Sequence, residues 1–60
     1  MRVNELKRLL REYGCYELSH GKEHDVWFSP VTNALIRVPR HQAKEVPYGT
    51  LRSILKQAGI

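Results

Sequence analysis

Residues 16–38 decide the fold of this chain, and their sequence is YELSHGKEHDVWFSPVTNALIRV. Three segments of this stretch, 16–20, 24–29 and 34–38, have the apolar alternation of strands. Turn-forming residues separate them, with Gly21-Lys22 after the first segment and residues 30–33, Pro-Val-Thr-Asn, after the second. Because connections this short join antiparallel neighbours, the stretch predicts a three-stranded antiparallel sheet.

A helix is predicted before the sheet. Its apolar residues have the spacing of one helical face and are Leu6, Leu9, Leu10 and Tyr13. We expect Asn4 to cap its start and Gly14 to end it in a left-handed conformation. Its charged residues are expected on the solvent side, at Lys7, Arg8, Arg11 and Glu12. Cys15, which follows, is expected to be a small buried apolar residue.

A second helix is predicted after the sheet. Its apolar face consists of Leu51, Ile54, Leu55 and Ala58. Pro47 or Thr50 can begin it, Gly59 can end it, and Ile60 is expected to contact Leu55. The order α-β-β-β-α predicts one α+β domain over residues 1–60, with two helices on one face of the sheet.

The middle strand could bury either of its faces. Alternation places His24, Val26 and Phe28 on one face and the residues Asp25, Trp27 and Ser29 on the other. We favour an exposed His24, because it follows a turn and adjoins two charged residues. Trp27 is then expected in the core, although an exposed Trp27 or Tyr48 could stack on a nucleic-acid base.

Composition excludes several classes of protein. Sixty residues are too few for a separate substrate domain, and one cysteine allows no internal disulfide, which suits a reducing cytoplasm. No apolar stretch is long enough to span a bilayer or to form a signal-peptide core. The formal net charge of +4 either attracts a polyanion such as nucleic acid or merely keeps the protein soluble.

Histidine offers the simplest chemistry for this chain. There is no glycine-rich phosphate loop and no recognisable nucleophile motif, and the spacing of His20, His24 and His41 does not suit a metal site. We therefore expect no metal and no cofactor. RNA carries its own nucleophile, the 2′-hydroxyl, so a protein need only move protons and stabilise negative charge. One histidine contributes about a hundred- to ten-thousand-fold in rate through such a transfer. The alternative is that His24 is a surface or hydrogen-bonded residue, as a single histidine on a small basic protein usually is.

Basic side chains lie near His24 in the predicted fold. Lys22, Arg37 or Arg40 could stabilise the charge that develops on a phosphate. Arg40, His41 and Lys44 cluster in the sequence where a phosphate could bind. The alternatives are that Arg37 is a solvated sheet residue and that residues 38–41 are only a strand end followed by a polar loop.

The chain resembles the HicA toxins of bacterial HicA–HicB toxin–antitoxin systems. The resemblance rests on Val38-Pro39-Arg40-His41, on Lys44-Glu45 and on residues 49–60, whose sequence is GTLRSILKQAGI. It extends over nearly the whole chain and implies a fold similar to a double-stranded-RNA-binding domain. It also implies a cytoplasmic, bacterial or archaeal RNA-cleaving toxin that a HicB antitoxin holds inactive.

The resemblance also assigns roles to the first turn. The family's Gly-Ser-x-His pattern reads Gly21-Lys22-Glu23-His24 here, with lysine in place of the serine. His24 thereby inherits the catalytic role and Gly21 the turn that positions it, while Lys22 brings a cation to the site. Asp25 could orient His24 or raise its pKa, although neighbouring strand residues point to opposite faces.

The resulting hypothesis is a metal-independent endoribonuclease toxin that cleaves mRNA and has a HicB-type antitoxin as partner. Its catalytic residue would be His24, and its RNA-binding residues would be Lys22, Arg37, Arg40, His41 and Lys44. Two alternatives remain open. One is a non-catalytic RNA-binding module with the same fold, and the other is a protein whose main role is to bind another protein.

Overall fold

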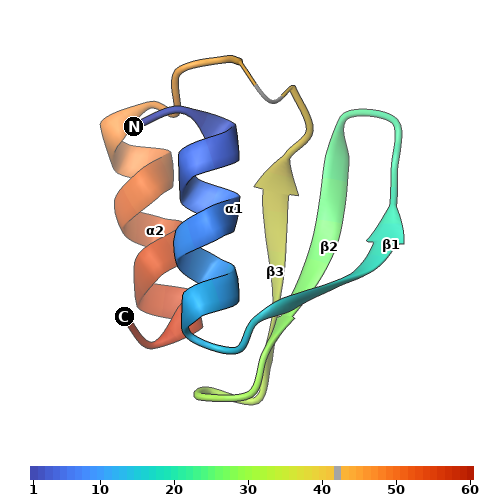
Figure 1. The fold of residues 1–60 in the computed structure, drawn as a ribbon, viewed down its shortest axis with the longest axis vertical. Coiled ribbons are helices and arrows are strands. Elements are labelled where there is room, and N and C mark those ends of the chain that lie inside the picture. Colours follow the sequence, from blue (N-terminus) through green and yellow to red (C-terminus); the bar gives the residue numbers. More distant parts are fainter. Residues whose placement is uncertain (42) are drawn as a thin grey trace.

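Two helices cover one face of a three-stranded antiparallel sheet (Figure 1). The computed structural model describes residues 1–41 and 43–60. The elements in chain order are α1 (Val3–Glu12), β1 (Tyr16–His20), β2 (His24–Ser29), β3 (Ala34–Pro39) and α2 (Tyr48–Ala58). The predicted α-β-β-β-α order and the three strands are confirmed, with β3 one residue longer than expected. The open three-stranded sheet makes the fold similar to a double-stranded-RNA-binding domain.

The sheet has the order β1-β2-β3, so each strand pairs with its neighbour in sequence. Trp27 pairs with Glu17 on one side and with Ile36 on the other, and its side chain is fully buried. The tryptophan face of β2 therefore packs under the helices, and His24 is exposed, as we favoured. A bulge between Glu17 and Ser19 shifts the register of β1 near its end.

Helix α1 begins earlier than predicted, and Asn4 does not cap it. Arg2 is the N-cap residue, and its backbone N–H donates to the Glu5 carboxylate at 2.9 Å. Arg2 also forms an isolated bridge with Glu45, and the Val3 N–H donates to the Lys44 carbonyl at 3.0 Å. These backbone contacts hold the chain in place ahead of Asn4, so the first helical turn forms there. Tertiary contacts therefore set the helix start.

Lys7 is buried, and its expected place on the solvent side is wrong. The buried face of α1 consists of Val3, Leu6, Lys7 and Leu10, which is the i, i+3, i+4, i+7 pattern of one helical stripe. The Lys7 ammonium donates to the Asp25 carboxylate of β2 at 2.8 Å, so the buried charge is paired. Tyr13, which was expected on the buried face, is 47% exposed because the helix ends at Glu12.

The chain segments after α1 and α2 both turn at a glycine in a left-handed conformation. Gly14 has a φ of 86° and Gly59 a φ of 82°, as the sequence predicted. At the end of α2, the Ile60 N–H donates to the Leu55 carbonyl at 2.9 Å. The Ser29 hydroxyl donates to the Ala58 carbonyl at 2.7 Å, which ties α2 to the end of β2. Helix α2 begins after Pro47.

The core lies between the helices and the sheet, and Cys15 belongs to it, as predicted. Its buried apolar residues are Val3, Leu6, Leu10, Cys15, Trp27, Ile36, Val38, Val46, Ile54 and Ala58. Within the described part of the chain, no helix combines the length and the apolar character needed to cross a membrane.

Candidate functional site

His24 is the first residue of β2 and its side chain is exposed. The turn before it is tight, because the Gly21 N–H donates to the His24 carbonyl at 3.1 Å. A Cβ atom on residue 21 would lie only 2.3 Å from that carbonyl oxygen. A residue with a side chain at position 21 would therefore force the turn, and with it His24, to move.

Arg40, the residue that follows β3, holds this turn in place. Its guanidinium Nη1 donates to the Gly21 carbonyl at 2.8 Å and lies 3.3 Å from the Lys22 carbonyl. Its backbone N–H donates to the Glu23 carbonyl at 3.2 Å. Arg40 thus contacts all three turn residues, a role that sequence reasoning did not anticipate. One guanidinium nitrogen is committed to the turn, so Arg40 is less available for a phosphate than a free arginine.

A cleft of about 460 Å³ lies beside His24, between the β1–β2 turn and the start of α2. In Figure 1 the β1–β2 turn and the start of α2 lie at the same end of the molecule. The residues that line the cleft are Val3, Glu23, His24, Pro39, His41, Lys44, Glu45, Pro47 and Thr50. The structure therefore brings His24, His41 and Lys44 to one hollow, together with the carboxylates of Glu23 and Glu45.

A second, smaller hollow of about 310 Å³ also borders His24. Its lining residues are Gly21, Lys22, Glu23, His24 and Arg37. Lys22 and Arg37 thus share the smaller hollow with His24, whereas His41 and Lys44 share the larger cleft with it. His24 and Glu23 are common to the two hollows. The arrangement places the imidazole of His24 next to cationic side chains, which are the groups that commonly bind phosphate.

Asp25 does not orient His24, and that expectation is wrong. Its carboxylate is fully buried on the opposite face of β2, with Lys7 on one oxygen and the His20 Nδ1 2.9 Å from the other. Burial raises the pKa of Asp25, but the hydrogen bond and charge of Lys7, with a smaller effect of His20, hold that pKa below its ordinary value of 3.8. The sequence contained one indication of the Lys7–Asp25 pair, because Lys7 lies on the same helical stripe as the buried apolar residues of α1.

Side chains that could bind a metal ion do come close together, but they are not the three histidines considered in the sequence. Among residues 1–41 and 43–60, the atoms of Glu17, His20 and Asp25 that could bind a metal lie within 4.8 Å of one another. The Lys7 ammonium already balances the charge of Asp25 there.

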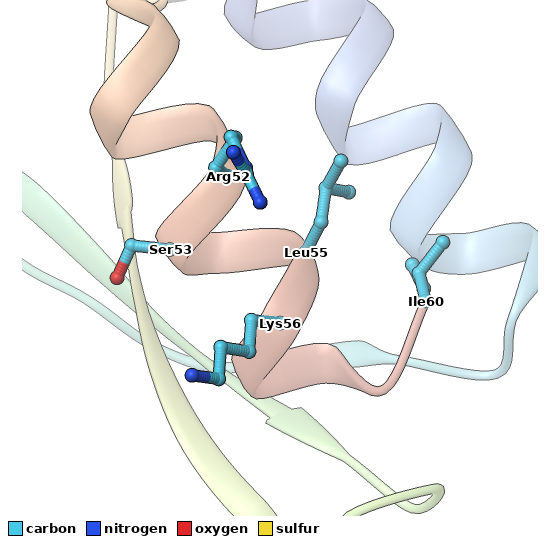
Figure 2. Close-up of a pocket in the computed structure, with 5 residues that line it drawn as sticks. All are labelled: Arg52, Ser53, Leu55, Lys56 and Ile60. Atoms are coloured by element: carbon cyan, nitrogen blue, oxygen red, sulfur yellow. The ribbon is translucent and has the colours of Figure 1, made fainter.

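A third hollow, on the outer side of α2, is lined by Arg52, Ser53, Leu55, Lys56 and Ile60 (Figure 2). It shares no residue with the two hollows at His24.

The fold and the site define a small basic α+β domain with an exposed histidine between two hollows that carry cationic side chains. The family model described as HicA toxin of bacterial toxin-antitoxin matches residues 3–60. The chain belongs to the HicA toxin family and is a toxin of a toxin–antitoxin system, which implies an antitoxin as its partner. Comparison with curated proteins found no significant match, and comparison with solved structures found none.

Proposed function

We propose that this HicA-family toxin is a metal-independent endoribonuclease that cleaves mRNA, with His24 as the catalytic residue, and that a HicB-type antitoxin inhibits it. The observation that carries the proposal is the position of His24, which is exposed and lines two hollows. Lys22 and Arg37 line one of them, and His41 and Lys44 line the other.

In the proposed reaction, His24 removes the proton from the 2′-hydroxyl of one nucleotide. The 2′-oxygen attacks the adjacent phosphorus, and the bond from phosphorus to the 5′-oxygen of the next nucleotide breaks. The products are a 2′,3′-cyclic phosphate and a 5′-hydroxyl, which forms when the leaving 5′-oxygen takes up a proton. All atoms come from the RNA, apart from the protons that pass through protein groups. DNA, which lacks the 2′-hydroxyl, cannot react in this way.

The leaving 5′-oxygen needs a proton donor. His41 borders the same cleft as His24 and is the candidate on this side; Glu23, which borders both hollows, is the carboxyl alternative. Lys22 would bind a phosphate equally in the ground state and the transition state, whereas Arg37 and Lys44 would bind phosphates and stabilise the negative charge that grows in the transition state. Arg40 would act mainly by holding the turn that carries His24.

Inhibition follows from the same surface. A protein with a net charge of +4 attracts an acidic partner. An antitoxin that presents carboxylates to the two hollows would compete with RNA phosphates for the same cations and cover His24.

Growth of bacteria that express the toxin from an inducible promoter tests the proposal. We expect the wild type to arrest growth with loss of full-length mRNA, and the His24→Ala variant to do neither at equal protein level. Co-expression of a HicB-type antitoxin should restore growth to the wild type and yield a co-purifying complex. A His24→Ala variant that arrests growth as the wild type does would contradict the catalytic role. A toxin that binds RNA without cleaving it would instead be the non-catalytic module.

A further inference from the structure

The open face of the sheet carries a row of apolar side chains that neither α1 nor α2 covers. Tyr16 pairs with Phe28, and Phe28 pairs with Leu35, so the three residues cross all three strands side by side. Directly paired residues point to the same face of a sheet, and Phe28 alternates with the buried Trp27. Tyr16 is 50% exposed, Leu35 is 62% exposed, and Phe28 is half-buried between them.

The two aromatic rings of this row contact each other at an angle. Their centroids are 5.6 Å apart and their planes are inclined by 49°. Such a pair presents two ring surfaces of different orientation, and not one continuous flat wall. This geometry suits two successive planar groups that lie at an angle to each other, as the unstacked bases of a single strand do.

The row is continuous with the candidate site along β2. His24, Val26 and Phe28 are alternate residues of that strand, so the distance from the imidazole to the row is about 13 Å at the usual rise of a strand. Arg37 pairs with Val26 and lies on the same face between them. Arg37 also lines the hollow that contains Lys22 and His24. The open face thus offers, in order, two aromatic rings, a guanidinium group and the histidine.

We propose that this face is a binding site for single-stranded RNA, in which two neighbouring bases stack on Tyr16 and Phe28, Arg37 binds a phosphate that follows them, and the strand continues to the hollow at His24. The inference rests on the proposed function, since it names the substrate class of that site. Base-paired RNA binds poorly here, because its bases are stacked on each other and cannot reach the rings.

Other aromatic side chains of the described chain are less suited to this role. Trp27 is fully buried, and the Arg11 guanidinium lies 5.2 Å from its ring centroid. Tyr48 is 72% exposed, but it lies on α2 with the Arg52 guanidinium 5.9 Å from its ring centroid. A second copy of the chain is a poor occupant of the open face, because face-to-face contact would bring the Arg37 and Lys22 charges of both copies together.

RNA binding by the intact protein tests the inference. The probe is a fluorescent 2′-O-methyl oligoribonucleotide, which cannot be cleaved through its 2′-oxygen, so the measurement does not depend on His24. Tyr16→Ala should weaken binding of the single strand about five- to a hundredfold, the effect expected for one stacked base. Tyr16→Phe should retain it, because the ring is kept. Tyr13→Ala is the matched control, since Tyr13 is equally exposed at the end of α1.

The salt dependence separates stacking from charge. Tyr16→Ala should leave the slope of log affinity against log salt unchanged, whereas Arg37→Ala should reduce it by about one. The same strand in a perfect duplex should bind more weakly than the free strand. The melting temperature of each variant shows that the fold is retained.

Three results would overturn the inference: a wild type that prefers the duplex, equal affinity in Tyr16→Ala and Tyr13→Ala, or a Tyr16→Ala variant that binds RNA normally but no longer co-purifies with its antitoxin. In the last case the face is a protein interface. If Tyr16→Ala weakens binding while His24→Ala still cleaves RNA, the stacking site stands and the proposed catalysis fails. If His24→Ala abolishes cleavage while Tyr16→Ala binds normally, the proposed catalysis stands and the stacking site fails.

Discussion

The ammonium group of Lys7 on α1 donates a hydrogen bond of 2.8 Å to the carboxylate of Asp25 on β2, and both side chains are almost completely buried. This pair joins the helix layer to the strand that begins with His24. Because adjacent strand residues point to opposite faces, the contact that draws Asp25 into the core directs His24 to the open side. The buried pair and the exposed histidine are thus two consequences of one strand orientation.

Removal of one partner of this pair should strongly destabilise the protein. We expect Asp25→Ala or Lys7→Ala to lower the free energy of unfolding by about 3–5 kcal/mol, because the remaining charge is left buried without a partner. Arg8→Ala, an exposed change on the same helix, should have little effect. Replacement of both partners, as Lys7→Met with Asp25→Leu, should cost less than either single change. Urea unfolding measures the free energy of unfolding of all four variants. A loss well below about 3 kcal/mol in Asp25→Ala would contradict the importance of the buried pair.

The protein should lose stability in acid through Asp25. Because its pKa is lower in the folded protein than its ordinary value of 3.8, the unfolded chain takes up this proton at a higher pH than the folded chain does. The stabilisation is therefore present above about pH 4 and is lost as the pH falls through the folded pKa. Glu45, whose pKa is lowered by its hydrogen bond to the N-terminal ammonium, contributes in the same direction.

Unfolding of Asp25→Asn tests this origin of the acid dependence. The urea midpoint of the variant, followed from neutral pH downwards, should vary less with pH than that of the wild type. Parallel curves for the two proteins would mean that other carboxylates cause the loss.

Gly21→Ala should impair both the fold of the turn and RNA cleavage. The added Cβ would meet the His24 carbonyl oxygen at 2.3 Å, so the β1–β2 turn must open and displace the imidazole. Gly49→Ala provides a matched control in the first turn of α2, where no atom lies within 4 Å of the new methyl group. That control should be neutral or stabilising by up to about 1 kcal/mol, because alanine favours helix. Equal cleavage rates and melting temperatures of the two variants would show that the turn accommodates a side chain at position 21, which would contradict this prediction.

Lys22 and Arg40 should affect different steps. Lys22 lines the hollow at His24, so Lys22→Ser should raise the KM for RNA and reduce the salt slope of binding by about one, with a small change in kcat. Arg40 donates to the turn, so Arg40→Ala should lower kcat and leave that slope nearly unchanged. Steady-state cleavage at two salt concentrations separates the effects. If Arg40→Ala lowered the salt slope as Lys22→Ser does, Arg40 would be a phosphate ligand after all.

Much of the fold was predictable because alternation and turn residues specify short antiparallel strands directly. The exposure of His24 followed from its place after a turn, and the burial of Trp27 agreed with it. The position of Lys7 was missed because it was judged by its charge and not by its place on the helical stripe. The start of α1 depends on backbone contacts with residues 44 and 45, which local sequence does not reveal.

The candidate site was predictable only as a set of residues. Arg40, His41 and Lys44 were predicted from the sequence to form one phosphate-binding cluster. In the structure Arg40 donates to the turn, whereas His41 and Lys44 line the cleft. The apolar row of Tyr16, Phe28 and Leu35 on the open face was not predicted, because both the row and its continuity with Arg37 depend on strand register.

Cleavage of a labelled RNA by the purified protein in the presence of EDTA tests the central claim most directly. The wild type should cut the RNA without added metal and leave 2′,3′-cyclic phosphate ends, and a 2′-deoxy substitution at the cleavage site should block the cut. His24→Ala should be inactive with an unchanged melting temperature, whereas His20→Ala, a histidine on the other face of the sheet, should still cleave. A His24→Ala protein that cuts at the wild-type rate, or a wild type that EDTA inactivates, would contradict the proposed metal-independent histidine catalysis.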